Sequence, residues 1–147
     1  MPATAAPDLW PSDLFSSPTA APPTPITILK QQGSALGART HNFVYGEVET
    51  EPDIPGTAFT HQFILVAPFL RYRKALLRVT HNLQPYPATV SETELTRIEG
   101  AKHFGRRVVN EEELRDTLRE FFNEPRVKEI LRSVHNLSND VAPPDGE

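Results

Sequence analysis

Prolines gather at the amino end of the chain, and they limit where a folded domain can begin. Seven of the 15 prolines lie within the first 25 residues, among alanine, serine and threonine. Proline supplies no backbone N–H group, and such a stretch buries too little apolar surface to offset the entropy lost on ordering. We therefore expect residues 1–23 to form a disordered Pro/Ala-rich leader, residues 24–137 a single domain and residues 138–147 an acidic tail.

The leader carries two similar short patterns, Asp8-Leu9-Trp10 and Asp13-Leu14-Phe15. An acidic residue followed by large apolar residues is typical of short docking segments, in which aromatic side chains act as anchors. The alternative is that these side chains cover the domain's own surface. We predict that Leu9, Trp10, Leu14 and Phe15 bind a partner.

The domain begins with a helix signal, because Thr24 is a suitable N-cap and Pro25 suits the first helical position. We expect this helix to stop at Gly37, since glycine favours helix ends. Three runs with strand chemistry follow, at residues 41–49, 59–67 and 74–83. After them we expect a short edge strand at 88–90, a helix opened by Ser91 and Glu94, and a brief strand at 106–109.

Alternation of apolar residues indicates a register for the strands. If paired residue numbers of the second and third runs sum to 142, Phe63 lies opposite Val79 and Leu65 opposite Leu77. The same logic places Tyr45 of the first run beside Phe63. Such apolar pairs are typical of the buried face of an antiparallel sheet. We therefore predict a meander with one apolar face.

The last third of the chain indicates two amphipathic helices. Asn110 can cap the first helix, whose opening turn holds three glutamates where the helix dipole favours them. Asn123 and Pro125 begin the second. The expected buried stripes are Leu114, Leu118, Phe121 and Phe122, then Val127, Ile130, Leu131 and Val134. The predicted fold class is α+β: an N-terminal helix, an antiparallel three- or four-stranded meander, and C-terminal helices packed on one sheet face.

The chemistry of the chain offers few catalytic signals. It has no cysteine, which excludes disulfides and thiolate chemistry, and we find no phosphate-binding or dinucleotide motif and expect no cofactor. The predicted register places Glu47, His61 and His81 in one row across the sheet. Two imidazoles and a carboxylate can hold a divalent metal. The alternative, which we favour, is a polar patch whose members satisfy each other by hydrogen bonds.

A second candidate site is cationic. Arg71, Arg73, Lys74 and Arg78 lie in a stretch, residues 54–90, that holds no acidic residue, and Tyr72 interrupts them. Basic residues next to an aromatic can bind phosphate groups. The alternative, favoured because the whole chain has a net charge of −4, is an ordinary solvated face with ion pairs.

The order of elements resembles secretion-chaperone-like and ubiquitin-conjugating-like folds. The cysteine required by an active conjugating enzyme is missing, and a shared order of elements implies no function. No apolar run reaches the roughly 20 residues of a membrane span, and the first basic residue is Lys30, which does not fit a targeting segment. We expect a cytoplasmic protein that does not bind membranes.

The predicted function is a non-catalytic interaction or accessory protein, such as a chaperone, antitoxin, immunity protein or complex subunit. It would act through its leader and sheet face, with another protein as partner and self-association as an option. One alternative is a nucleic-acid or phosphate-binding module that uses the basic strand. A further alternative is a metal-dependent hydrolase that uses Glu47, His61 and His81.

Overall fold

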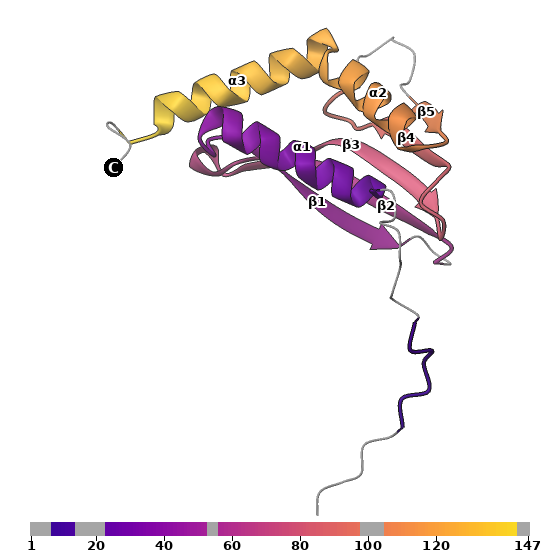
Figure 1. Cartoon of the computed structure of the whole chain (residues 1–147). Coiled ribbons are helices and arrows are strands. Elements are labelled where there is room, and N and C mark those ends of the chain that lie inside the picture. The colour runs from indigo at the N-terminus through magenta and orange to yellow at the C-terminus, as the bar shows by residue number, and fades with distance from the viewer. Residues whose placement is uncertain (1–6, 14–22, 53–55, 98–104, 144–147) are drawn as a thin grey trace, which may run out of the picture.

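The computed structural model describes residues 7–13, 23–52, 56–97 and 105–143. Within these residues, one helix, five strands of a single antiparallel sheet and two further helices follow in chain order (Figure 1). The elements are α1 (Pro25–Thr40), β1 (Tyr45–Pro52), β2 (Ala58–Ala67), the 3-10 turn η1 (Pro68–Leu70), β3 (Tyr72–Asn82), β4 (Ala88–Glu92), β5 (Gly105–Val108), α2 (Glu111–Phe122) and α3 (Pro125–Val141). Each strand pairs with its neighbours in sequence. The α+β prediction is confirmed, with five strands instead of three or four.

Helix α1 begins as predicted and ends later than predicted. The Thr24 side chain accepts a hydrogen bond from the Thr27 amide, and Pro25 occupies the first turn. The helix passes through Gly37 and ends at Thr40, where His41 adopts a left-handed conformation with φ of 55°. The predicted stop at Gly37 is wrong because that glycine is buried against the chain around Tyr45, so its small size serves packing and not termination.

The observed strand register differs from the predicted one. Tyr45 pairs with Val66 instead of Phe63, and Phe63 pairs with Leu77 instead of Val79. After Phe63 the register shifts by one residue, so that Ile64 pairs with Ala75 and Leu76 forms a β-bulge. From Phe59 to Phe63 the shift is two residues, which alternation could not detect because it keeps every side chain on its face. Beyond the bulge, and between β1 and β2, the shift is three residues and reverses the faces.

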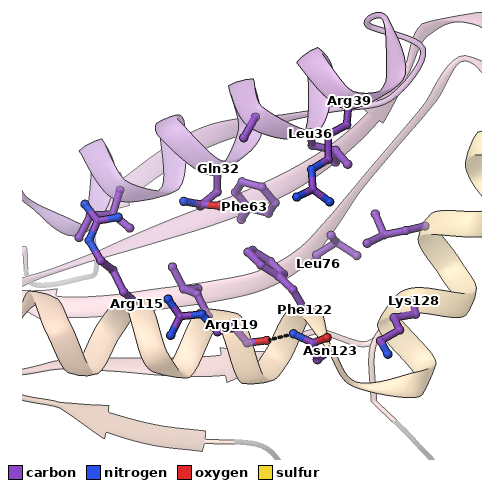
Figure 2. A pocket seen from close by; sticks show the side chains of 14 residues that line it. Gln32, Leu36, Arg39, Phe63, Leu76, Arg115, Arg119, Phe122, Asn123 and Lys128 are labelled. Carbon is purple, nitrogen blue, oxygen red and sulfur yellow. Dashed lines mark hydrogen bonds between the residues drawn. The ribbon is translucent and has the colours of Figure 1, made fainter.

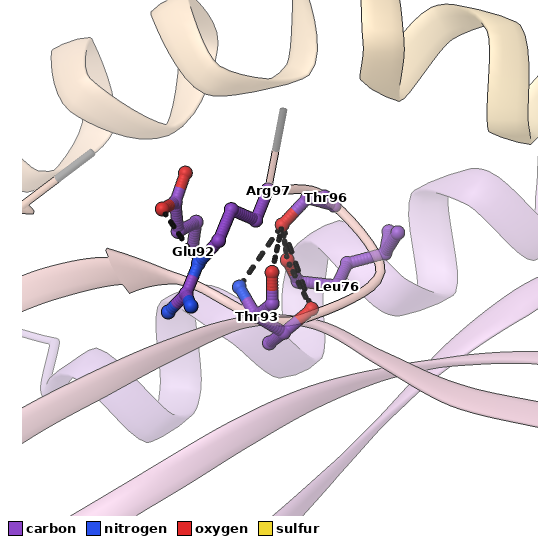
Figure 3. A network of polar contacts seen from close by, with 5 residues as sticks. All are labelled: Leu76, Glu92, Thr93, Thr96 and Arg97. Carbon is purple, nitrogen blue, oxygen red and sulfur yellow. Dashed lines mark hydrogen bonds and ion pairs between the residues drawn. The ribbon is translucent and has the colours of Figure 1, made fainter. Parts of the chain in front are cut away.

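As far as Arg97, the segment after β4 is a turn and not the start of the predicted helix, whose continuation to Ile98 lies outside the described residues. Ser91 belongs to β4, and residues 94–96 form a tight turn. The hydroxyl groups of Thr93, just before this turn, and of Thr96, within it, face β3 (Figure 3). The hydroxyl of Thr93 donates to the carbonyl of Ala75 at 2.7 Å, and the hydroxyl of Thr96 donates to the carbonyl of Leu76 at 3.0 Å. Both threonines are buried. They satisfy carbonyl groups of β3 next to the point where its pairing with β4 begins, at Leu77.

Replacing Thr96 with valine is expected to lower the free energy of unfolding by about 1–3 kcal/mol. The two side chains have nearly the same shape, so the loss comes from hydrogen bonds: the Leu76 carbonyl loses its nearer donor, and the Thr93 amide loses the hydroxyl to which it donates at 3.0 Å. Urea unfolding followed by circular dichroism measures the effect. Thr89→Val, at an exposed position of β4, is the control and should change stability by less than about 0.5 kcal/mol. Equal effects of the two changes would contradict a structural role for the Thr96 hydroxyl.

All three helices lie over the same face of the sheet (Figure 1). Leu114, Leu118 and Phe121 of α2 are buried in the core between helices and sheet, as predicted. The stripe of α3 is also buried, at Val127, Ile130 and Val134. Phe122 and Leu131 were expected in these stripes, but each is only partly buried.

Helix α3 ends later than predicted. Helix α3 continues to Val141, past position 137, where we had placed the end of the domain. Within the described parts of the chain, every helix is too short or too polar to cross a lipid bilayer.

Candidate binding groove

A groove of about 520 Å³ lies between α1 on one side and α2 with the start of α3 on the other (Figure 2). Its floor is the sheet, which contributes Phe63 and Leu76. The two partly buried side chains of the helix stripes, Phe122 and Leu131, line it from α2 and α3. The Phe63 and Phe122 rings lie with centroids 5.9 Å apart. The groove therefore has a continuous apolar base.

All charged side chains that line the groove are cationic. They are Arg39 of α1, Arg115 and Arg119 of α2, and Lys128 of α3. Arg115 pairs with Glu111 at 2.9 Å and Arg119 with Asp116 at 3.0 Å. Arg39 and Lys128 form no ion pair with any residue that the structure describes. The rim therefore keeps positive charge available for a ligand.

The size and lining of the groove restrict what it can bind. A cavity of about 150 Å³ is enough to hold benzene, so a groove of about 520 Å³ has room for an aromatic side chain together with an aliphatic one. Carboxylates placed next to these side chains would meet the guanidinium and ammonium groups of the rim. Such a lining is chemically suited to a segment that carries large apolar and acidic side chains next to one another.

The leader holds such a segment. Leu9 and Trp10 are 87% and 74% exposed, and the amide of Trp10 donates to Asp8 Oδ1 at 3.0 Å in an Asx turn. Residues 7–13 contain neither helix nor strand. Leu14 and Phe15, the other two predicted anchors, lie outside the described residues.

The predicted histidine pair is brought together by a geometry other than the predicted one. His61 pairs with Val79 across the strands, and His81 lies diagonally from it on the same face. Their Nε2 atoms are 2.6 Å apart, a hydrogen-bonding distance and shorter than the roughly 3.3 Å between two nitrogen ligands of a tetrahedral zinc ion. Glu47 pairs with Ile64, three positions from His61, and does not join them.

The hydrogen bonds of the pair assign its protons. His81 Nδ1 faces the carbonyl of Asn82, which can only accept, so this nitrogen carries a proton. His81 Nε2 then accepts from His61 Nε2–H, and His61 Nδ1 accepts from the hydroxyl of Thr50 at 2.8 Å. Two neutral rings satisfy every one of these contacts. Among the described residues, no three metal-ligating side chains gather around the pair or elsewhere.

Acid is expected to destabilise the protein through His61. Burial, and to a smaller degree the charge of His81, lowers the pKa of His61 to about 4 from an ordinary value of 6.5. The unfolded chain therefore binds this proton more tightly than the folded one, and stability is lost as the pH falls from about 6.5 to 4. The loss amounts to about 3 kcal/mol.

Urea unfolding at pH 7 and pH 4 measures this effect. His61→Gln keeps a donor and an acceptor but does not titrate, so its loss of stability between the two pH values should be about 3 kcal/mol smaller than that of the wild type. The difference between the two proteins removes the contribution of the carboxylates. The same pH dependence in both would show that His61 is not the titrating group.

The structure spreads the four cations predicted to bind anions, namely Arg71, Arg73, Lys74 and Arg78. Arg73 donates to Glu47 at 2.9 Å and to Glu49 at 2.6 Å, so two carboxylates of β1 neutralise it. Lys74 follows on the opposite face of β3, and Arg71 occupies the turn after η1. Arg78 lies five residues beyond Arg73 along β3, where it pairs with Gln62 and Ser91. The four cations therefore do not converge on one phosphate-sized site.

The groove itself was missed by sequence reasoning. Its apolar base was taken for core, because Phe122 and Leu131 extend the helix stripes. One signal was present: Arg115 and Arg119 alternate with Leu118 and Phe122 at spacings of three and four, which places cations beside an apolar stripe.

Comparisons with known protein families, with curated proteins and with solved structures find no match to this chain.

Proposed function

We propose that this protein is a non-catalytic interaction protein whose groove binds a short segment of another protein. The observation that carries the proposal is the combination of an apolar base with two rim cations, Arg39 and Lys128, that form no ion pair within the part of the chain that the structure describes. The partner segment would place a large aromatic or aliphatic side chain on Phe122 and Leu131, which are partly buried apolar side chains of the groove. It would carry an acidic residue next to that side chain, facing the cations of the rim.

The energetics of such a contact favour recognition of a short segment. A buried aromatic anchor supplies most of the affinity at protein interfaces, and charges at the rim supply orientation and selectivity. Arginine can also stack on an aromatic face. The same groove would reject a basic segment, because like charges would be brought together without solvent between them.

Other predicted functions receive less support from the geometry. A phosphate-binding strand would need its cations on one face, whereas Arg73 and Lys74 lie on opposite faces and Arg73 is already paired. A metal-dependent hydrolase would need Glu47 beside His61, whereas the Glu47 side chain binds Arg73.

Selection of random 12-residue peptides displayed on phage tests the proposal with the full-length chain. Enriched peptides are expected to contain an acidic residue within three positions of a large apolar one. Their affinity should fall roughly tenfold or more in the double variant Arg39→Glu/Lys128→Glu, because both free cations of the rim are reversed.

A matched control separates the groove from net charge. Lys30→Glu/Arg132→Glu makes the same charge change on the same two helices, at exposed positions outside the groove, and should leave the affinity within about twofold. Enrichment of basic peptides, or equal losses in the two double variants, would overturn the proposal.

A further inference from the structure

We infer that the chain's own segment Asp8-Leu9-Trp10 docks in the groove of the same molecule and competes there with the partner segment. This inference rests on the proposed function and adds its regulation. It assigns the exposed side chains of Leu9 and Trp10 to a site, and it predicts that the protein exchanges between a form in which they are exposed and a form in which they are docked.

The leader segment and the groove are chemically complementary. The leader segment joins one carboxylate to one aliphatic and one aromatic side chain, and the groove joins an apolar base to free cations. The leader, residues 1–23, contains two acidic residues, Asp8 and Asp13, and no basic one, so nothing in its charge opposes the rim. The indole of Trp10 can lie on Phe122 while Asp8 meets Lys128 or Arg39.

The leader segment is preorganised for binding. The Asx turn formed by Asp8 fixes the backbone between the carboxylate and the indole, with Leu9 and Trp10 both exposed. A segment already held in a turn loses less conformational freedom on binding than an unconstrained one.

The tether between Trp10 and α1 is long enough to reach the groove. The leader joins the domain at Thr24, directly before α1, and α1 forms one wall of the groove. The tether from Pro11 to Pro23 spans at most roughly 45 Å when fully extended. Helix α1 has 16 residues and is about 24 Å long. The tether is therefore long enough for Trp10 to return along α1 to any point of the groove.

The tether also sets the strength of the competition. A short linker gives an effective concentration of about 1 mM for the tethered segment. With an intrinsic Kd of about 0.1 mM, the leader would occupy the groove about nine-tenths of the time, and the partner's apparent affinity would fall about tenfold. A second copy at micromolar concentration competes poorly with such a tether, so docking within one molecule is favoured.

Trp10 is the single tryptophan of the chain, so its fluorescence reports on the leader alone. In the full-length protein we expect a blue-shifted emission maximum and protection from acrylamide quenching, both independent of protein concentration. Arg39→Glu/Lys128→Glu should shift the emission to that of an exposed indole and raise the quenching constant at least twofold. Lys30→Glu/Arg132→Glu, the control, should leave both unchanged.

Peptide affinity measures the competition between the leader and the partner segment. In the variant Leu9→Ser/Trp10→Ser, a phage-selected peptide should bind about tenfold more tightly than to the wild type. The inference would be overturned if the Trp10 emission is that of an exposed indole and does not change in the groove variants. It would also be overturned if protection from quenching rises with protein concentration while the molecular mass in solution doubles. The proposed function survives either result if the selected peptide still binds the groove. The proposed function fails, while the inference about the leader stands, if the groove protects Trp10 but no peptide binds the Leu9→Ser/Trp10→Ser chain.

Discussion

Replacing Gly33 with alanine is expected to lower the free energy of unfolding by about 1–2 kcal/mol, although alanine suits a helix better than glycine does. A Cβ atom at this position would lie 2.3 Å from the carbonyl oxygen of Gly46 and 2.8 Å from its carbonyl carbon. Both are backbone atoms of β1, so α1 would have to move away from the sheet. Overpacking of this kind costs about 1–3 kcal/mol and occasionally more, whereas the gain in helix propensity is about 1 kcal/mol.

Two other glycines provide graded controls for this prediction. Gly37→Ala meets the Asn42 side-chain oxygen at 2.7 Å, which can rotate away, so its cost should be smaller. Gly105→Ala in β5 meets no atom within 4 Å and should be nearly neutral or stabilising. Urea unfolding of the three variants measures the order. A Gly33→Ala protein as stable as the wild type would mean that α1 does not lie this close to β1.

Replacing Phe121 with alanine is expected to cost about 3–5 kcal/mol of stability, while the same change at its neighbour Phe122 should cost about 1–2 kcal/mol. Phe121 is 2% exposed in the core, so its removal leaves a cavity that the surrounding side chains cannot fill. Phe122 is partly buried at the base of the groove, where solvent can occupy the space. Thermal or urea unfolding of both variants checks the difference.

Binding should show the opposite order. At a temperature at which both variants are folded, Phe122→Ala is expected to weaken binding of a groove-selected peptide by about tenfold, because an aromatic anchor site is lost. Phe121→Ala should leave that affinity nearly unchanged. Equal stability losses, or equal binding losses, would show that the two side chains do not divide between core and groove.

Features that depend on local chemistry were predictable from the sequence. The start of α1 follows from Thr24 and Pro25, and the start of α2 follows from Asn110, whose side chain accepts from the Glu113 amide at 2.8 Å. The stripes of α2 and α3 follow from a period of 3.6 residues. These signals need only a few neighbouring residues, so they do not depend on where the rest of the chain lies.

The histidine pair shows how a prediction can reach the right neighbours by a wrong register. His61 and His81 were expected directly opposite one another, and they meet diagonally because the true register is shifted by two residues. Both arrangements keep the two imidazoles on one face. Glu47 did not follow them, because β1 is shifted by three residues and an odd shift turns its side chain to the other face.

The sequence by itself determined the fold class, the position of the two C-terminal helices and the chemistry of the exposed leader segment. Only the tertiary structure decided the bulge at Leu76, the role of Gly33 as a contact surface, and the groove. The physical reason is the range of the interactions. Capping and periodicity act within one or two helical turns, whereas a groove exists only where side chains from α1, α2, α3 and the sheet fail to close over one another.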